Sequence, residues 1–580
     1  METRMAWKLS ASFPVRLIGL LAAATIVLSG CATGPRSAPQ SSSPTTPPPN
    51  QQAKTLRLAF LVEPAGMAGF GRVGQNALPL AWMFNAGLNA YDAQGNLQPR
   101  LAQKVPSLQD GDWKVAPDRT MEVTWKLRPN LTWHDGTALT AEDFALGIQV
   151  AADPELPLAR SGGVARIKDA TASDAETLIV HWSQPYFGAN QGSVNDVPAV
   201  PRHLLQDLYL QGDKQAFVNS PYWSTRFVGL GPYRLKDWVQ GSHIEGLAFD
   251  AYVLGRPRID RVIVRYILDA GVMVASLLGG EIDMVARGEL TLDDVAPLAS
   301  AWGSTGEGTV LTAASEVYLA LLQYRDPSLP WVNDVRVRQA LLHLIDRQTL
   351  GDTFSPGGSG LPHLLAAPND PAYLLAEQRG FAKYPFEPTR AGMLLAAAGW
   401  TKGQDGAVQN SAGQRFSVEV RVNTDSAPPA LATANYWKQG GLDAPIVVIP
   451  DNAADRTMQR AMSQGVYTQS QSLAFDFPTA FTSATIRSEQ NNWSGANTGG
   501  FSNAAYDRLY SEYSSELDPA RRRSLQADFL KSAADEAIVF PLFYSIGQST
   551  TVFRRGIHGP AATAPIQLST HWNIHEWEMD

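Results

Sequence analysis

Apolar and polar residues alternate along several short segments of this chain, which is the pattern of half-buried β-strands. The clearest are MEVTWKL at 121–127 and RVIVRYIL at 261–268. Further strands are predicted at 55–62, 177–182, 415–422 and 445–449. Apolar residues at helical spacing predict helices at 79–89, from 141 onward, and at 272–278, 334–350, 390–398, 503–511 and 519–534. Strands alternate with helices but also follow one another directly, which predicts a mixed α/β fold.

The ends of several helices carry recognisable signals. Thr140, followed three residues later by Asp143, predicts a capping box. Asp334 is predicted to cap the helix that begins after it. The glycines at 279–280 and at Gly399 are predicted to end the helices that precede them.

Size and charge narrow the class of protein. The chain has 580 residues and a formal net charge of −8. At roughly 100–200 residues per domain, this length predicts three or four structural units. The negative charge argues against a nucleic-acid-binding protein, which needs a basic face. A single cysteine excludes a disulfide framework and a cysteine-rich metal site.

The segment 1–31 has the pattern of a bacterial lipoprotein signal peptide. Arg4, Lys8 and Arg16 are followed by an uncharged apolar run at 17–28. This run is shorter than the roughly 20 residues of a membrane-spanning helix. It leads into LSGC, which looks like a lipobox, and its cysteine, Cys31, is the only one in the chain. We therefore predict lipidation at Cys31 and attachment to a membrane through the lipid alone.

The segment 32–54 is rich in Pro, Ser and Thr and is predicted to be an extended tether between the lipid and a folded domain. No other stretch has 18 consecutive apolar residues, so no transmembrane helix is predicted. The predicted location is extracytoplasmic, at the surface of a one-membrane cell or facing the periplasm of a two-membrane cell.

Two motifs suggest chemistry and are given a simpler interpretation. GFGRVG at 69–74 fits G-x-G-x-x-G, but six residues separate it from the preceding strand, so no nucleotide cofactor is predicted. HWNIHE at 571–576 places His571 and His575 four residues apart, but no third ligand is evident, so packing is predicted rather than metal binding. The chain has neither a G-x-S-x-G elbow nor a P-loop lysine motif, and no catalytic residue is predicted.

Several segments, in the same order, resemble the family 5 solute-binding proteins that serve bacterial oligopeptide, dipeptide and nickel ABC importers. They are LRPNLTWHDGTALTAED at 127–143, GLGPYRLKDW at 229–238, LLGGEIDMV at 277–285, NDVRVRQA at 333–340 with IDR at 345–347, NWSG at 492–495 with YD at 506–507, and FPLFY at 540–544. The charged and glycine residues of these motifs are predicted to serve the fold rather than the ligand, as turns, caps and ion pairs.

The resemblance implies a periplasmic-binding-protein-like fold of two lobes, with an extra domain on the first lobe and a ligand cleft between the lobes. The first lobe would comprise 55–92, 225–324 and 546–580. The extra domain would be 93–224, and the second lobe 325–545.

The same resemblance implies a set of ligand-binding residues. In oligopeptide-binding members an Asp holds the α-ammonium of the peptide, and LAFDFP at 473–478 places Asp476 at that position. Neighbouring residues that would line the site are Ser472, Leu473 and Ala474. Glu63, just after the first strand, and Trp493 complete the predicted set.

The predicted function is therefore capture of a peptide-like solute and delivery to ABC permease subunits, by a monomer that makes and breaks no bond. Ser470, Gln471 and Ser472 stand where an Arg for a peptide carboxylate can occur, so a non-peptide ligand stays open: a glycan, an opine, a metal chelate or a lipid headgroup. A ligand-sensing receptor or scaffold without import is a further alternative, and an extracytoplasmic hydrolase is the remaining one.

Overall fold

The computed structural model describes residues 53–580, apart from 68–76, 157, 159–162, 195–196, 313–315, 357–359, 451–454, 474–476, 492, 494, 547–549 and 564–568. The predicted signal peptide, Cys31, nearly all of the predicted tether and the glycine motif at 69–74 lie outside the described residues. The described part of the chain contains three larger sheets, of seven, five and four strands. None of its helices combines the length and the apolar character of a membrane span.

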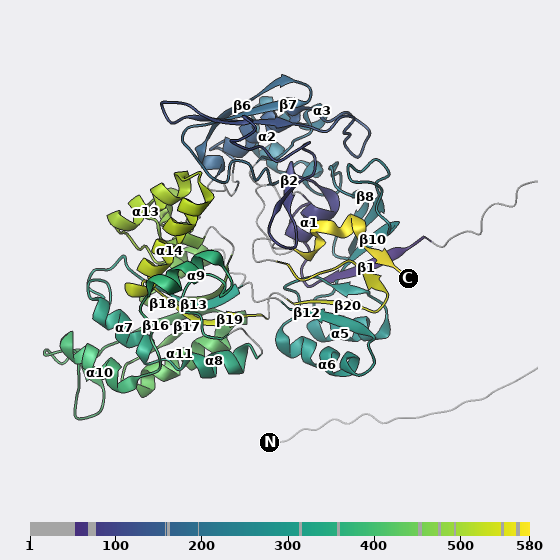
Figure 1. The fold of residues 1–580 in the computed structure, drawn as a ribbon. Coiled ribbons are helices and arrows are strands. Elements are labelled where there is room, and N and C mark those ends of the chain that lie inside the picture. Colours follow the sequence, from purple (N-terminus) through teal and green to yellow (C-terminus); the bar gives the residue numbers. More distant parts are fainter. Residues whose placement is uncertain are drawn as a thin grey trace, which may run out of the picture. The chain divides into compact units, whose positions relative to one another are not determined.

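The seven-stranded sheet has the order β12-β20-β11-β1-β10-β9-β8 (Figure 1). Its strands are β1 (Thr55–Phe60), β8 (Tyr233–Val239), β9 (His243–Ala248), β10 (Arg261–Tyr266), β11 (Met284–Val285), β12 (Gly308–Leu311) and β20 (Thr551–Arg554). β1 is parallel to both β10 and β11, whereas the other pairings are antiparallel. The three parallel strands therefore end at the same edge of the sheet.

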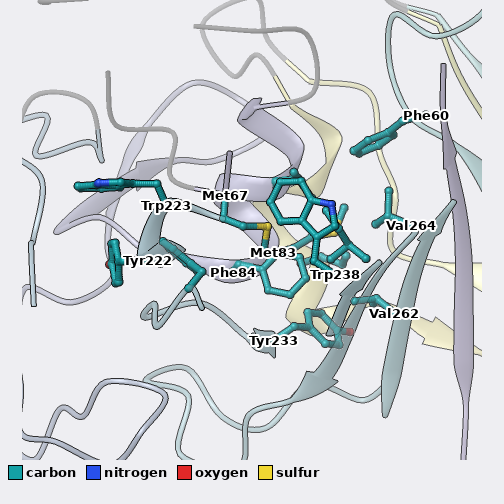
Figure 2. Close-up of a cluster of buried hydrophobic side chains, with 14 of the residues drawn as sticks. Phe60, Met67, Met83, Phe84, Tyr222, Trp223, Tyr233, Trp238, Val262 and Val264 are labelled. Atoms are coloured by element: carbon teal, nitrogen blue, oxygen red, sulfur yellow. The ribbon is translucent and has the colours of Figure 1, made fainter. Parts of the chain in front are cut away.

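Both faces of this sheet are covered by other elements. Successive side chains of a strand point to opposite faces, so neighbouring residues of β1 pack in different cores. On one face, Leu58 packs in an aromatic-rich core that includes Phe84 of α1 (Ala77–Phe84) and Trp238 (Figure 2). On the other face, Ala59 packs with residues of α5 (Ala270–Gly279) and α6 (Leu292–Gly303). Gly280 ends α5 at φ +77°, a conformation that glycine adopts at little cost, as predicted for this position.

The four-stranded sheet is antiparallel, with the order β4-β5-β7-β6. Its strands are β4 (Trp113–Val115), β5 (Met121–Lys126), β6 (Ile167–Asp174) and β7 (Thr177–Trp182). The alternation predicted for 121–127 is confirmed, since Met121, Val123 and Trp125 of β5 are buried and the residues between them are more exposed. The sheet packs against α2 (Ala141–Ala152), whose predicted capping box is present. The segment continues through η1 (Val164–Arg166), α3 (Arg202–Leu210), α4 (Lys214–Val218) and η2 (Pro221–Trp223).

The five-stranded sheet has the order β17-β16-β18-β13-β19. Its strands are β13 (Glu316–Leu322), β16 (Glu419–Asn423), β17 (Ile446–Ile449), β18 (Gly465–Ser472) and β19 (Val539–Ser545). β16 is parallel to β17 and β18, and β13 runs antiparallel between β18 and β19. Alternate residues of β13 belong to two different core clusters, so this strand is apolar on both faces and its sequence is a continuous apolar run.

Helices surround the five-stranded sheet, and short hairpins complete the described residues. The helices are α7 (Val335–His343), α8 (Arg347–Phe354), α9 (Pro371–Arg379), α10 (Pro388–Ala397), α11 (Ala427–Gln439), α12 (Arg456–Ala461), α13 (Ala504–Ser515) and α14 (Pro519–Asp535), with the 3-10 turns η3 (Thr424–Ser426), η4 (Phe477–Phe481), η5 (Ser483–Thr485) and η6 (Glu489–Asn491). The hairpins are β2 (Asn89–Tyr91) with β3 (Leu97–Pro99), β14 (Thr401–Lys402) with β15 (Val408–Gln409), and β21 (Ile557–His558) with β22 (Glu578–Met579), which follows η8 (Thr570–Glu576).

The prediction of one helix over 334–350 is wrong, because the structure has two helices there. Asp334 caps α7 as predicted, accepting a hydrogen bond from the backbone N–H of Arg336. Asp346 then caps α8, accepting from the backbone N–H of Thr349. A capping carboxylate satisfies N–H groups that have no partner within the helix, so a second cap inside an apolar-periodic stretch marks a new helix.

The charged residues of the family-like motifs hold the fold together, as predicted. Asp283, next to β11, receives two hydrogen bonds from the guanidinium of Arg57 at 2.6 and 2.8 Å. The guanidinium of Arg338 on α7 donates to the backbone oxygens of Trp331 and Glu536 at 2.7 Å each. Gly136 adopts φ +87° in the turn after Asp135. Each of these contacts joins segments that are distant in sequence or fixes a tight turn.

The chain passes between the seven-stranded and five-stranded sheets twice. It leaves the first at β12 and enters the second at β13, and it returns from β19 to β20. β13 lies within the range 225–324 that was assigned to the first lobe, yet it pairs with β18 and β19 of the five-stranded sheet. The boundary between the two sheets therefore falls between Leu311 and Glu316.

The two C-terminal histidines lie in the core of the protein. His571 is fully buried, and its ring lies 5.2 Å from that of Trp577. His575 is 7 % exposed and lies 5.4 Å from the ring of Tyr252. Burial disfavours the charged imidazolium and lowers the pKa of each histidine to about 3. No group of three or more metal-ligating side chains occurs among the described residues.

This burial predicts an acid-sensitive fold. Each histidine has a lower pKa in the folded state than the usual 6.5, so the unfolded chain binds more protons and stability falls as pH drops from about 6.5 toward 3. At pH 5 one such histidine costs about 2 kcal/mol of unfolding free energy. We expect His571→Gln to reduce the difference in urea-unfolding midpoint between pH 7 and pH 5. His558→Gln, at an exposed position, is the control; an equal reduction in both variants would contradict this prediction.

Candidate ligand-binding site

The carboxyl ends of parallel strands define one edge in each of the two larger sheets. In the seven-stranded sheet β1, β10 and β11 end at Phe60, Tyr266 and Val285. In the five-stranded sheet β16 and β18 end at Asn423 and Ser472. Open α/β sheets bind ligands in the crevice outside the carboxyl ends of their strands. These two edges are therefore the places to look for ligand-binding side chains.

Glu63 follows β1 at the edge of the seven-stranded sheet. One carboxylate oxygen accepts a hydrogen bond from Trp238 Nε1 at 2.7 Å, and the other accepts from the backbone N–H of Gly241 at 2.9 Å. The residue also lines a cavity of about 490 Å³ together with Trp223 and Trp238. Glu63 thus anchors the segment after β1 to the β8–β9 turn, and both of its oxygens already have a donor.

Ser472 ends β18 at the edge of the five-stranded sheet, and Leu473 is the next residue. Ser472 is half-buried and lies opposite Glu316, the first residue of β13, in the antiparallel ladder. Leu473 is 7 % exposed and belongs to the core cluster on one face of the sheet. The structure therefore brings Ser472 to the edge and places Leu473 among core side chains.

The other predicted residues are described only in part. Asp476 and Ala474 lie outside the described residues, as does the lipidation site Cys31. Trp493 is half-buried, and its backbone N–H donates to the oxygen of Ser488 at 2.8 Å. Its φ of +58° is in the left-handed region, which costs a non-glycine residue roughly 1–2 kcal/mol.

An ion pair that the sequence did not indicate joins the two edges. Arg287, two residues after β11, approaches Glu316 of β13 with a nitrogen–oxygen distance of 3.5 Å. Both side chains are 13 % exposed. The pair therefore links the seven-stranded sheet to the five-stranded sheet where the chain crosses between them. In the sequence, Glu316 is a single charged residue before the apolar run VYLALL. A strand whose end is exposed to solvent has the same pattern, so the sequence does not distinguish the two.

The electrostatics of this pair are dominated by burial. Loss of water raises the pKa of the Glu316 carboxyl and lowers that of the Arg287 guanidinium, and the attraction between the two opposes both shifts only in part. The second carboxylate oxygen of Glu316, Oε2, is buried and has no hydrogen-bond partner among the described residues. A buried carboxylate is stable only when its lone pairs are satisfied, so this oxygen has capacity for a donor.

A second contact connects the five-stranded sheet to the four-stranded one. Phe187, which follows β7, has its ring 5.2 Å from that of Tyr513 on α13. The guanidinium of Arg522 on α14 lies 4.7 Å from the Phe187 ring centroid, and the Phe187 N–H donates to the Ser514 oxygen at 3.2 Å. This contact links the four-stranded sheet to helices of the five-stranded sheet, in addition to the two chain crossings and the ion pair described above.

The arrangement of the two larger sheets agrees with the family to which the sequence is similar. The sequence model of the bacterial extracellular solute-binding proteins, family 5, middle part, matches residues 97–493. The match covers more than half of the chain, which therefore belongs to this family. The family is one of bacterial extracellular solute-binding proteins.

Individual relatives are distant. A Brucella ovis protein named for peptide binding in ABC transport is 25 % identical over 294 residues, 50 % of this chain and 51 % of the relative, so the chain matches about half the length of that relative. The oligopeptide-binding protein AppA of Bacillus subtilis is 24 % identical over 409 residues, 70 % of each chain. The oligopeptide-binding protein of Thermus thermophilus, solved with a pentapeptide, superposes with a TM-score of 0.74 at 23 % identity, covering 90 % of this chain and 96 % of that chain.

The solved oligopeptide-binding proteins of Thermus thermophilus and Bacillus subtilis, both matched by this structure, have two lobes and a ligand cleft, so the predicted fold class is confirmed. Below, we call the seven-stranded sheet with the elements packed on it lobe I, and the five-stranded sheet with its helices lobe II.

The Phe187 contact yields a prediction about the link between the four-stranded sheet and lobe II. Removing the ring in Phe187→Ala deletes an aromatic pair and a cation–π contact, worth together about 1–3 kcal/mol. We expect faster amide hydrogen exchange in α13 and the first turns of α14, measured by mass spectrometry. Phe249→Ala is the control. It also removes a phenylalanine ring, but that ring packs at 5.0 Å against His134, a residue outside α13 and α14. Equal acceleration of α13 in both variants would show that the Phe187 contact is not specific to this link.

Proposed function

We propose that this protein is the substrate-binding subunit of a bacterial ABC importer, which captures a peptide-like solute between its two lobes and delivers it to membrane permease subunits. The observation that carries the proposal is the pair of strand edges, one in each lobe, brought together at the double chain crossing in a member of family 5. The peptide-binding names of the Brucella and Bacillus relatives support a peptide ligand. The protein acts by binding and release and by no covalent step.

We further propose the division of the chain. Lobe I comprises 55–92, the segment from 225 to the crossing after β12, and 546–580. The extra domain is 93–224, and lobe II begins at β13 rather than at 325, because β13 pairs within the five-stranded sheet. The protein is proposed to work as a monomer.

For the ligand contacts we propose that Asp476 binds the α-ammonium of the peptide, with Ser472 and Ala474 beside it. A charge-assisted hydrogen bond to an ammonium group is worth about 1.5–3 kcal/mol. Glu63 and Trp493 are proposed to line the cleft, with Glu63 acting through its hold on the segment after β1. Leu473 supports this edge from the core.

One observation favours a different ligand. Ser470, Gln471 and Ser472 give the end of β18 neutral polar side chains. Neutral side chains at the end of β18 suit a glycan, an opine or a chelate as well as a peptide without an anchored carboxylate. Mass spectrometry of the ligand that co-purifies with the native protein decides between these classes.

The peptide proposal makes a quantitative prediction. We expect synthetic peptides with free N-termini to bind in isothermal titration calorimetry, and Asp476→Asn to weaken them by roughly 10- to 100-fold. The same peptides with acetylated N-termini lack the ammonium group and should lose much less on this substitution. Equal losses for both sets would remove Asp476 from this role, and absence of any peptide binding would overturn the peptide proposal.

We also propose that the protein is lipid-anchored through Cys31 and held outside the cytoplasm by the tether at 32–54. Cys31 is the only cysteine of the chain and ends the LSGC motif. We expect labelling with a fatty-acid analogue and recovery in the membrane fraction for the wild type, and loss of both for Cys31→Ser. Membrane recovery of the variant together with lipid labelling at another position would contradict the proposal.

A further inference from the structure

The Glu316 carboxylate is the unexplained group at the junction of the two lobes. Among the described residues, its Oε1 is approached by Arg287 at 3.5 Å, which is longer than an ordinary hydrogen bond. Its Oε2 is shielded from solvent and has no donor among the described residues. Within the part of the chain that the structure describes, the charged group that shifts the pKa of this carboxyl is Arg287, which lowers it against the larger effect of burial. Arg287 offsets only part of the desolvation free energy of this buried carboxylate, and a further cationic donor would offset the rest.

Another buried ion pair of lobe II is closer and better hydrogen-bonded than Arg287–Glu316. Glu419 and Arg421 are nearly as buried, at 15 and 14 % side-chain exposure, but their nitrogen–oxygen distance is 2.7 Å. Glu419 Oε1 also accepts from the backbone N–H of Gln464. Glu419 begins β16, so it lies at the opposite edge of the sheet from Glu316. The well-paired carboxylate is thus far from the candidate site, and the poorly paired one is at it.

The position of Glu316 fits a ligand contact better than a role in lobe packing. It lies across the ladder from Ser472, a residue of the proposed site, and it faces a residue of the other lobe. A carboxylate has about four lone-pair positions and can accept from an arginine on one oxygen and an ammonium on the other. Because Arg287 belongs to lobe I and Glu316 to lobe II, a ligand held at Oε2 would also sit against the pair that joins the lobes.

We propose that Glu316 binds a cationic group of the ligand, a primary ammonium or guanidinium, through Oε2, so that the protein selects ligands with a positive charge at the lobe junction. This inference deepens the proposed function and rests on it for the choice of peptides as ligands. The cation has two sources in a peptide: a lysine or arginine side chain, with the α-ammonium held by Asp476 as proposed above, or the α-ammonium itself, in which case Glu316 holds it in place of Asp476.

The test uses Glu316→Gln, which keeps the size of the side chain and an oxygen for Arg287 but removes the negative charge. Four peptides of one length are titrated by calorimetry: with and without one lysine, each free and N-acetylated. We expect the variant to weaken the peptides that carry the recognised cation by about tenfold or more and the acetylated lysine-free peptide by less than about twofold. Loss that follows the free N-terminus identifies the α-ammonium, and loss that follows lysine identifies the side chain.

Glu419→Gln is the matched control, and it should leave all four affinities unchanged. Equal weakening of the four peptides by Glu316→Gln would show that the pair only holds the lobes together, and no change at all would also overturn the proposal. Circular dichroism and thermal unfolding of the variant confirm that it is folded.

A second measurement keeps this test separate from the peptide proposal. If the wild type binds none of the peptides, the peptide proposal fails, and n-butylammonium at tens of millimolar replaces them, with 1-butanol as the neutral probe. We expect the ammonium ion to raise the melting temperature of the wild type and of Glu419→Gln, but not of Glu316→Gln, because a ligand stabilises only the protein that binds it. An equal rise in all three proteins, or none in the wild type, would then overturn the assignment of Glu316.

Discussion

The arrangement of the candidate site depends on parallel strand pairing in two separate sheets. Parallel strands end at one edge, and in this protein β1, β10 and β11 form such an edge in lobe I while β16, β17 and β18 form one in lobe II. The chain then crosses between the sheets at the start of β13 and at the end of β19. Because β13 is antiparallel to β18, its first residue, Glu316, lies at the carboxyl edge of lobe II. A charged side chain is thereby brought to the junction by topology.

Much of the fold could be predicted from the sequence, because its signals are local. The alternation in β5, the capping box before α2 and the glycine after α5 each depend on neighbours a few residues apart, and the structure has all three. The break between α7 and α8 was missed, since apolar periodicity continues through it and the cap at Asp346 is visible only as one acidic residue. The motif residues Asp283 and Arg338 were correctly assigned to the fold.

The candidate site was less accessible to such reasoning. The contact between Arg287 and Glu316 joins the segment after β11 to the first residue of β13 in the other sheet, and nothing in either local sequence indicates that they meet. Leu473 was expected at the site from its place in a family-like motif, but its side chain packs in the core. The motif does not indicate to which face of the sheet the side chain points. Asp476 and Ala474 lie outside the described residues and stay predictions. Long-range pairing and side-chain direction at a strand end are set by packing, which a local pattern does not contain.

The aromatic contact of Phe187 with Tyr513 and Arg522 has a consequence for the energetics of capture. It brings together the four-stranded sheet and lobe II without any ligand atom, so part of the free energy that favours this conformation is present before a solute arrives. Each 1.4 kcal/mol of such bias changes the ratio of two conformers about tenfold. A substitution at this ring shifts the apparent dissociation constant for every solute by the same factor when the contact forms in only one of the two conformers, and it then changes the working range of a fluorescent biosensor without altering its selectivity.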